Sequence, residues 1–190
     1  MTDPVRIDLP VDRVVLAELM SGDQVRLYGP VFTARDATHA RLLEELRRDG
    51  CLPYGLEGQT LFYAGPTPAA QGRPAGSVGP TTAKRMDEFT PELLAAGIVA
   101  TIGKGSRSEA VRLACGHTGS VYFAAVGGAA ALLATHVVAA EPVAYEDLGT
   151  EALVRMELDG LPAFVAIDAL GGDLYSRAPV VWRESGGERE

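Results

Sequence analysis

Alternating hydrophobic and polar positions predict mainly β structure over residues 4–35. Residues 6–9 alternate, and residues 25–28 form a strand-like run that ends at a Gly-Pro pair. The chain continues extended through residues 31–33. Residues 14–20 form a short helix or strand before a Ser-Gly-Asp turn. We therefore expect several short strands before the first long helix.

The hydrophobic period then changes to that of a helix. Asp36 can cap a helix over residues 37–48, where apolar side chains recur at helical spacing until Gly50 ends it. A short apolar strand is expected at residues 61–64. These elements indicate that the first third of the chain mixes strands with one amphipathic helix.

Residues 65–80 contain eight Gly or Pro. Such a stretch is either a linker between domains or an irregular loop that crosses one end of a sheet. We favour the loop, because neither flanking part is long enough to form a comfortable separate domain. We accordingly expect one domain over residues 1–176, followed by a polar, flexible tail at residues 177–190.

From residue 90 onward the pattern indicates a βαβ arrangement. Thr90 is expected to cap a helix with Pro91 in its first position, and Ser108 to cap a second helix that ends near residue 113. The apolar run at residues 120–126 is typical of a strand buried on both faces. The other expected elements are a strand at 98–102, a helix at 129–135, a strand at 141–145 and a closing pair at 152–158 and 162–167.

Composition and charge narrow the class of protein. The chain has 190 residues, of which 47% are hydrophobic and 22% charged, as in globular domains. The net charge of −8 argues against a partner that is nucleic acid or a membrane surface, because such binders need an excess of Lys and Arg. The longest apolar run, residues 121–134, is shorter than the roughly 20 residues of a membrane span. With no signal-peptide pattern, we expect a cytoplasmic protein.

The two cysteines, Cys51 and Cys115, do not form a metal-binding pattern. Neither belongs to a Cys-x-x-Cys pair, so this chain alone cannot supply a zinc or iron–sulfur ligand set. We expect no metal site in the chain, and free thiols that are buried or half-buried in a reducing compartment.

Hydroxyls and cations lie side by side in the segment from Gly79 to Asp87. Thr81 and Thr82 follow a Gly-Pro break, and Arg85 follows within a few residues. A threonine hydroxyl takes part in proton transfer only where cations stabilise its alkoxide or a nearby group accepts its proton. The pattern predicts a loop that holds an anion.

Two further segments offer cations for the same purpose. Lys104 lies between two glycines at the end of an expected strand and before a helix, where backbone amides favour an anion. It is either a ligand contact or a solvated turn lysine, and the segment is not a Walker loop. Arg35 precedes another expected helix and can offer a planar fork to a carboxylate. Among the histidines, His39 is near Arg35, whereas His117 and His136 follow no pattern and are interpreted as structural. On physical grounds alone the site binds a dicarboxylate or a phosphate.

Taken together, the motifs resemble the β subunit of the class I, iron–sulfur-dependent fumarate hydratase and L-tartrate dehydratase family. This subunit is equivalent to the C-terminal domain of the single-chain enzymes. The resemblance rests on Ser-Gly-Asp at 21–23, Thr-Ala-Arg-Asp-Ala-Thr-His at 33–39, Tyr-Ala-Gly-Pro-Thr at 63–67, Gly-Pro-Thr-Thr at 79–82, Arg-Met-Asp at 85–87, Thr-Pro at 90–91, Gly-Lys-Gly at 103–105, Tyr-Phe-Ala-Ala with Gly-Gly at 122–128, and Tyr-Glu-Asp-Leu-Gly at 145–149.

The resemblance implies a fold and an activity. The fold would be α/β, a swivelling β/β/α domain with a mixed central sheet and flanking helices. The activity would be reversible hydration of fumarate to L-malate. It would depend on a [4Fe–4S] cluster whose cysteine ligands belong to an α subunit, in an α2β2 assembly. This chain would then be an active hydro-lyase only together with its α subunit.

Carried over residue by residue, the resemblance assigns roles to four side chains. Thr81 matches the proposed catalytic base, and Arg35, Arg85 and Lys104 match the cations that bind the substrate carboxylates. No role is carried over to His39. Lys84 departs from the family pattern, and it either tunes substrate preference or points to solvent.

Alternatives stay open at this point. The substrate could be L-tartrate or mesaconate, although the residues around positions 89–94 and 102–108 favour two-subunit fumarases. The chain could also be a non-catalytic carboxylate-binding or assembly module of the same fold. A free-standing phosphate binder is supported only by the glycine-flanked lysine.

Overall fold

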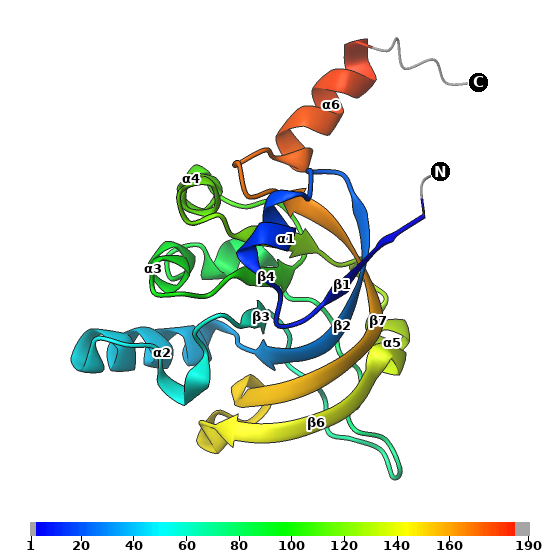
Figure 1. Cartoon of the computed structure of the whole chain (residues 1–190). Helices are drawn as coiled ribbons and strands as arrows, with labels where there is room; N and C mark the ends of the chain where they lie inside the picture. The colour runs from blue at the N-terminus through cyan, green and yellow to red at the C-terminus, as the bar shows by residue number, and fades with distance from the viewer. Residues whose placement is uncertain (1–2, 185–190) are drawn as a thin grey trace.

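A mixed seven-stranded sheet forms the centre of the protein (Figure 1). The computed structural model describes residues 3–184. The strand order is β1-β2-β3-β4-β5-β7-β6, and β2 also pairs with β7. The strands are β1 (Val5–Asp8), β2 (Gln24–Thr33), β3 (Thr60–Phe62), β4 (Ala100–Gly103), β5 (Val121–Ala124), β6 (Val137–Ala144) and β7 (Leu153–Ile167).

The additional pairing closes the sheet into a barrel-like ring. Strands β2, β3, β4 and β5 are parallel to one another, and β7 runs antiparallel to both β5 and β2. The β2–β7 ladder is long, from the Gln24–Phe164 pair to the Thr33–Val154 pair. Strands β1 and β6 extend the sheet outside the ring. Closure leaves few unpaired backbone groups at sheet edges.

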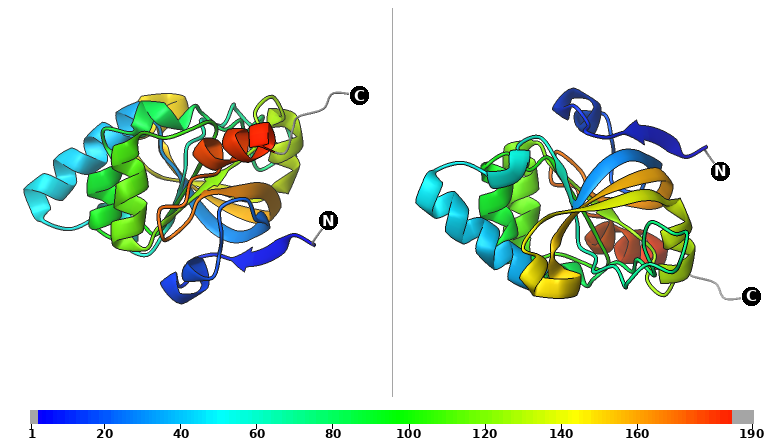
Figure 2. Two further views of the ribbon diagram at one scale, coloured as in Figure 1. Left: turned by 90° about the horizontal axis from the view of Figure 1, so that it is seen from above. Right: turned by 90° about the horizontal axis from the view of Figure 1, so that it is seen from below.

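Helices flank this ring, as the sequence predicts for a mixed sheet. Three of them lie side by side on one side (Figures 1 and 2), and the Arg47–Glu92 ion pair joins two of the three. The helices are α1 (Arg13–Ala17), α2 (Asp36–Asp49), α3 (Thr90–Ala95), α4 (Glu109–Thr118), α5 (Ala130–Leu133) and α6 (Leu174–Glu184), and the neighbouring three are α2, α3 and α4. None of the helices described combines the length and the apolarity that a bilayer span requires.

Side-chain alternation divides the core between the two faces of the strands. In β3 and the residue after it, Phe62 belongs to one hydrophobic cluster, whereas Leu61 and Tyr63 belong to the other. In β5, Phe123 and Tyr122 divide in the same way. Successive side chains of a strand point to opposite faces, so these strands are buried on both sides. The prediction of a fully buried apolar strand at β5 is confirmed.

Several expected boundaries were wrong. Asp36 is the first residue of α2 rather than its cap, and Arg35 precedes it without capping by its side chain. Thr90 likewise begins α3, and its hydroxyl donates to the Met86 carbonyl. The expected closing pair of elements is one strand, β7, and α4 continues beyond residue 113. Ser108 does occupy the N-cap position of α4.

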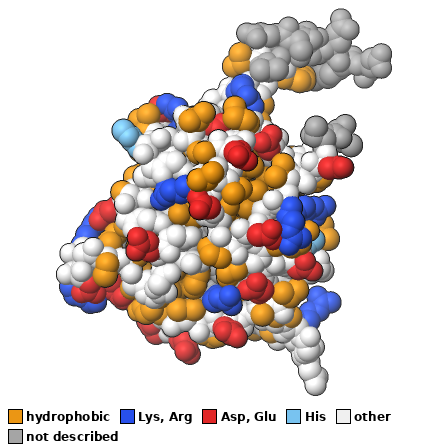
Figure 3. All heavy atoms as spheres, viewed as in Figure 1, with side chains coloured by type: hydrophobic (Ala, Val, Ile, Leu, Met, Phe, Trp, Pro, Cys, Tyr) orange, Lys and Arg blue, Asp and Glu red, His pale blue; other side chains and the backbone are white. Residues whose placement is uncertain are grey.

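The C-terminal segment contains a helix that the sequence pattern did not indicate. Helix α6 covers residues 174–184, which include the start of the polar, flexible tail predicted from residue 177. The rest of the predicted tail lies outside the described residues. On the face shown in Figure 3, basic and acidic side chains are interspersed, so neither sign gathers into one field.

Candidate functional site

The candidate residues follow the carboxyl ends of the parallel strands. Arg35 comes two residues after the end of β2, and Lys104 comes directly after β4. Thr81 and Arg85 belong to the connection that leaves β3. Ligands of parallel α/β sheets commonly bind at this edge, because loops that leave neighbouring strands meet there. The fold thus brings to one edge four residues that the sequence spreads over 70 positions, from 35 to 104.

Backbone hydrogen bonds fix Thr81 between the ends of β3 and β4. The Thr81 amide donates to the Tyr63 carbonyl at 2.6 Å, and the Lys104 amide donates to the Thr81 carbonyl at 3.1 Å. The Ala83 amide in turn donates to the Lys104 carbonyl at 2.9 Å. A side chain at Gly103 would lie 2.9 Å from the Tyr63 ring, so only glycine allows this close approach.

The polar ends of Thr81 and Lys104 are not engaged elsewhere. Both residues are half-buried. Within residues 3–184 the Thr81 hydroxyl makes no hydrogen bond, and the Lys104 ammonium makes no ion pair. A half-buried cation without a partner attracts an anion. The structure therefore leaves both groups free to meet a ligand.

A cavity opens beside Lys104. Its volume is about 480 Å³, and Thr82, Gly127, Phe164 and Tyr175 contribute to its lining. A Cβ atom at Gly127 would lie 3.3 Å from the Lys104 Cδ atom. The absence of a side chain at this glycine therefore leaves room for the Lys104 side chain along the cavity wall. Its size suits a small ligand bound next to one cation.

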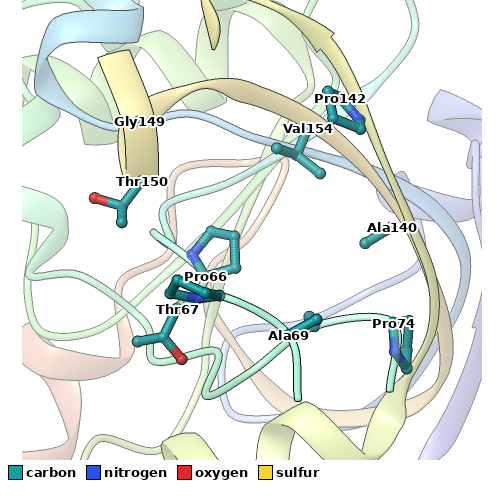
Figure 4. A pocket seen from close by; sticks show the side chains of 11 residues that line it. Pro66, Thr67, Ala69, Pro74, Ala140, Pro142, Gly149, Thr150 and Val154 are labelled. Atoms are coloured by element: carbon teal, nitrogen blue, oxygen red, sulfur yellow. The ribbon is translucent and has the colours of Figure 1, made fainter. Parts of the chain in front are cut away.

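A second cavity lies between the glycine- and proline-rich loop and strands β6 and β7 (Figure 4). It measures about 360 Å³, and no charged side chain lines it. Pro66, Pro142 and Val154 form part of its apolar wall. A dianion would find no counter-charge there, which makes this cavity unsuitable for a dicarboxylate.

Arg35 and Arg85 both contact one carboxylate, that of Asp36. Arg85 donates from Nε to Asp36 Oδ1 at 2.9 Å, and its Nη2 lies 2.8 Å from Oδ2. Arg35 Nη2 lies 3.9 Å from the same Oδ2 atom and 3.3 Å from Glu151 Oε1. The sequence predicted both arginines but not the carboxylates that hold them.

A buried ion pair supports the two segments that carry Arg85 and Lys104. The Arg107 side chain is 0% exposed, and its Nε donates to Asp87 Oδ1 at 2.6 Å. The other Asp87 oxygen accepts from the Ser108 amide at 2.6 Å and so caps α4. Arg107 also donates to the Thr90 hydroxyl at 2.7 Å. No role for Arg107 was predicted from the sequence, because no local pattern indicates its partner Asp87.

His39 is buried and contacts the backbone of Arg35. Its Nδ1 lies 2.8 Å from the Arg35 carbonyl oxygen, and its ring meets the Tyr63 ring edge-on at 5.2 Å. Burial, reinforced by the nearby charge of Arg107, lowers the pKa of His39 to about 4. The imidazole is therefore neutral near pH 7. Because the Arg35 carbonyl oxygen can only accept, Nδ1 carries the proton and donates to it.

Lys84 and the cysteines stand apart from this site. Lys84 is exposed and forms no ion pair with any described residue. Cys115 is buried, as predicted, and its burial raises the pKa of the thiol to about 12. Cys51 is exposed, so the prediction of a buried or half-buried thiol was wrong there.

Comparison with known proteins identifies the family. The family described as Fumarase C-terminus matches residues 1–178. This chain belongs to the Fumarase C-terminus family. Fumarate hydratase 2 of Leishmania major is 36% identical over 182 residues, which are 93% of this chain and 32% of that protein. The aerobic class I fumarate hydratase of Escherichia coli K12 is 35% identical over 181 residues, 92% of this chain and 33% of that protein.

A Fumarase C-terminus chain also occurs as a separate subunit. The L(+)-tartrate dehydratase subunit beta of Escherichia coli K12 is 33% identical over 181 residues, which are 92% of this chain and 88% of that subunit. The chain thus spans about a third of the length of the fumarate hydratases it matches, but most of the length of this β subunit. The recognition of the family from its motifs is confirmed.

The chain's own side chains do not fit an iron–sulfur cluster. In residues 3–184, no three His, Cys, Asp or Glu side chains gather as a metal site. Cys115 is a residue of α4 that is buried within a hydrophobic cluster, and Cys51 is exposed just after the C-terminal end of α2. A cluster held by cysteines needs at least three thiolates in one place.

Proposed function

We propose that this chain is the β subunit of a two-subunit hydro-lyase that interconverts fumarate and L-malate. One observation carries the proposal. Thr81, whose hydroxyl is unengaged among the described residues, is hydrogen-bonded through its backbone to Lys104 at the sheet edge where Arg35 and Arg85 also lie. A dicarboxylate needs cations for both of its ends, and a base at the carbon between them.

Each side chain has a distinct role in this proposal. Lys104, Arg35 and Arg85 bind the carboxylates of the substrate. The Thr81 alkoxide, stabilised by the neighbouring cations, takes the proton from the carbon next to a carboxylate in dehydration and becomes the hydroxyl, which returns the proton in hydration. Tight pairing of that carboxylate lowers the pKa of the neighbouring carbon acid, so the cations also favour the proton transfer.

The [4Fe–4S] cluster implied by the resemblance belongs, in this proposal, to the α subunit. The active site is then shared, and this chain alone is inactive. The separate β subunit among the relatives supports a two-chain arrangement. An α2β2 assembly, a cytoplasmic location and a swivelling β/β/α classification of the domain are parts of the same proposal.

Two other functions compete with fumarate hydration. The chain could belong to an L-tartrate dehydratase or a mesaconate hydratase, since one relative is a tartrate dehydratase subunit. It could also be a non-catalytic carboxylate-binding or assembly module. That last function predicts that no neighbouring reading frame encodes a partner with three cluster cysteines.

The test is an anaerobic assay of the reconstituted α and β chains. Fumarate, mesaconate and L-tartrate are offered separately, with each chain alone as the control. We expect turnover of fumarate to exceed that of the other two substrates, and only with both chains present. A preference for L-tartrate or mesaconate would identify that compound as the substrate in place of fumarate. The absence of turnover with all three would contradict the proposed function.

A further inference from the structure

Asp36 lies between the two arginines of the candidate site and contacts both. Its carboxylate accepts the Nε hydrogen bond of Arg85 at 2.9 Å, and its other oxygen lies 3.9 Å from Arg35 Nη2. The exposed fractions of the side chains are 22% for Arg35, 32% for Asp36 and 51% for Arg85. Burial thus decreases from Arg35 through Asp36 to Arg85, and Arg85 is the most exposed of the three side chains.

The contact uses only one edge of the Arg85 guanidinium. Asp36 faces Nε and Nη2, which leaves the Nη1 side without a partner among the described residues. Arg35 has an unused donor too, since its buried Nε meets no acceptor in the described part of the chain. A guanidinium presents five N–H donors in a rigid fork, so it can hold one carboxylate on each edge.

The backbone fixes the position of Asp36. It is the first residue of α2, where the partial positive charge of the helix N-terminus stabilises a carboxylate. Glu151 pairs with Arg35 and also accepts from the Ala37 amide at 2.9 Å. Each arginine therefore has a carboxylate anchored to the start of the same helix.

Two guanidinium groups brought to one site repel each other. A carboxylate between them offsets this repulsion and fixes the direction in which each presents its free donors. A negative charge at this position need not compete with the ligand, because it occupies the opposite edge of Arg85.

We infer that Asp36 is a positioning residue for dicarboxylate binding: it orients Arg85 and sets its spacing from Arg35. This inference rests on the proposed function, because it assumes that the two arginines bind substrate. It adds a residue that acts through Arg85 rather than by touching the substrate itself.

The test compares Asp36→Asn with the wild type in the reconstituted two-chain enzyme. The amide keeps the shape but removes the charge that pairs with Arg85. We expect KM for fumarate to rise by about 10- to 100-fold while kcat stays within about threefold, as for loss of a charged hydrogen bond that serves binding. Asp36→Glu should recover much of the affinity. The matched control is Asp8→Asn, which removes an Asp–Arg pair on the exposed strand β1.

A double-mutant cycle separates positioning from a general structural role. In an Arg85→Met background, Asp36→Asn should change KM by less than about threefold, because its effect passes through Arg85. An equal effect in both backgrounds, an unchanged KM, or a lower KM that signals competition with substrate would overturn the inference.

The outcome also distinguishes this inference from the proposed function. If the wild-type complex turns over no dicarboxylate, the proposed function fails and the inference fails with it. If the wild type and Asp8→Asn are active while Asp36→Asn behaves like them, only the inference fails. Thermal unfolding of each variant shows that the comparison is made between folded proteins.

Discussion

The carboxylate of Asp87 and the guanidinium of Arg107 form an ion pair with a separation of 2.6 Å, and both side chains are almost fully buried. Arg107 also lies over the rings of Tyr63 and Tyr122, at 5.2 and 4.9 Å from their centroids. The pair ties the short helical turn that carries Arg85 to the segment that follows Lys104. It thereby joins the two halves of the candidate site.

Replacing Arg107 by Met should destabilise the protein strongly. The change leaves the Asp87 carboxylate buried without its counter-charge, which costs about 3–5 kcal/mol of unfolding free energy. Urea unfolding of the isolated chain measures this loss. The control is Arg47→Met, which breaks the exposed pair with Glu92 and should cost less than about 1 kcal/mol. Equal losses in the two variants would contradict a structural role for the buried pair.

His39 should make stability depend on pH. Its pKa is about 4 in the folded chain and 6.5 ordinarily, so on acidification the unfolded chain takes up the proton first. The neutral form of His39 thereby contributes up to about 3 kcal/mol to the unfolding free energy. This contribution is fully present above pH 6.5 and is lost as the pH falls towards 4. Urea unfolding at a series of pH values measures the slope.

Two variants isolate the contribution of His39. His39→Gln removes the titrating ring and should flatten the slope between pH 6.5 and 4, whatever its effect on stability at neutral pH. His117→Gln, which removes an exposed imidazole, is the comparison variant. A wild-type slope preserved in His39→Gln would show that other groups cause the acid sensitivity.

Arg35 packs so closely against Gly65 that no room is left for a side chain at position 65. A Cβ atom at this position would lie 2.9 Å from Arg35 Nη1 and 2.9 Å from the Thr150 carbonyl oxygen. Gly65→Ala should therefore lower the unfolding free energy by about 1–3 kcal/mol. By displacing Arg35 it should also raise KM for fumarate by about tenfold or more.

The comparison for Gly65 is Gly116→Ala in α4. An added methyl group there makes only ordinary contacts, the nearest at 3.4 Å, and alanine favours a helix. This variant should keep both the stability and the KM of the wild type. If Gly65→Ala also keeps the stability and the KM of the wild type, the position of Arg35 does not depend on the space that the glycine leaves.

Local patterns in the sequence predicted individual elements better than their long-range pairing. Helix α2, the N-cap position of Ser108 and the doubly buried strand β5 all follow from hydrophobic period and turn residues. Closure of the ring by β2 and β7 does not, because it joins residues more than 120 positions apart, such as Thr33 and Val154. No local signal encodes such a pairing.

The same limit applies to the candidate site. Arg35, Thr81, Arg85 and Lys104 were predicted because the motifs around them are specific. The ion-pair partners of the two arginines, Glu151 and Asp36, were missed, and so was the supporting pair of Asp87 with Arg107. Each of these carboxylates meets its arginine only after the chain has folded, and an acidic residue alone in a sequence does not indicate its partner.

The two cysteines should differ sharply in reactivity. Cys51 is exposed, whereas Cys115 is buried with a thiol pKa raised to about 12. The thiolate is the reactive form, so a thiol reagent at neutral pH should label one cysteine quickly and the other only on unfolding. Mass spectrometry of Cys51→Ser and Cys115→Ser assigns the two sites. Rapid labelling of Cys115 in the folded chain would contradict its burial.

The central claim is that the Thr81 hydroxyl moves the proton, and one substitution tests it most directly. In the reconstituted two-chain enzyme, Thr81→Ala should lower kcat for fumarate by about 10²- to 10⁴-fold with assembly intact. Thr81→Ser should retain much of the activity, and Thr135→Ala, which removes an exposed hydroxyl, should match the wild type. A Thr81→Ala enzyme with near-normal kcat would contradict the account.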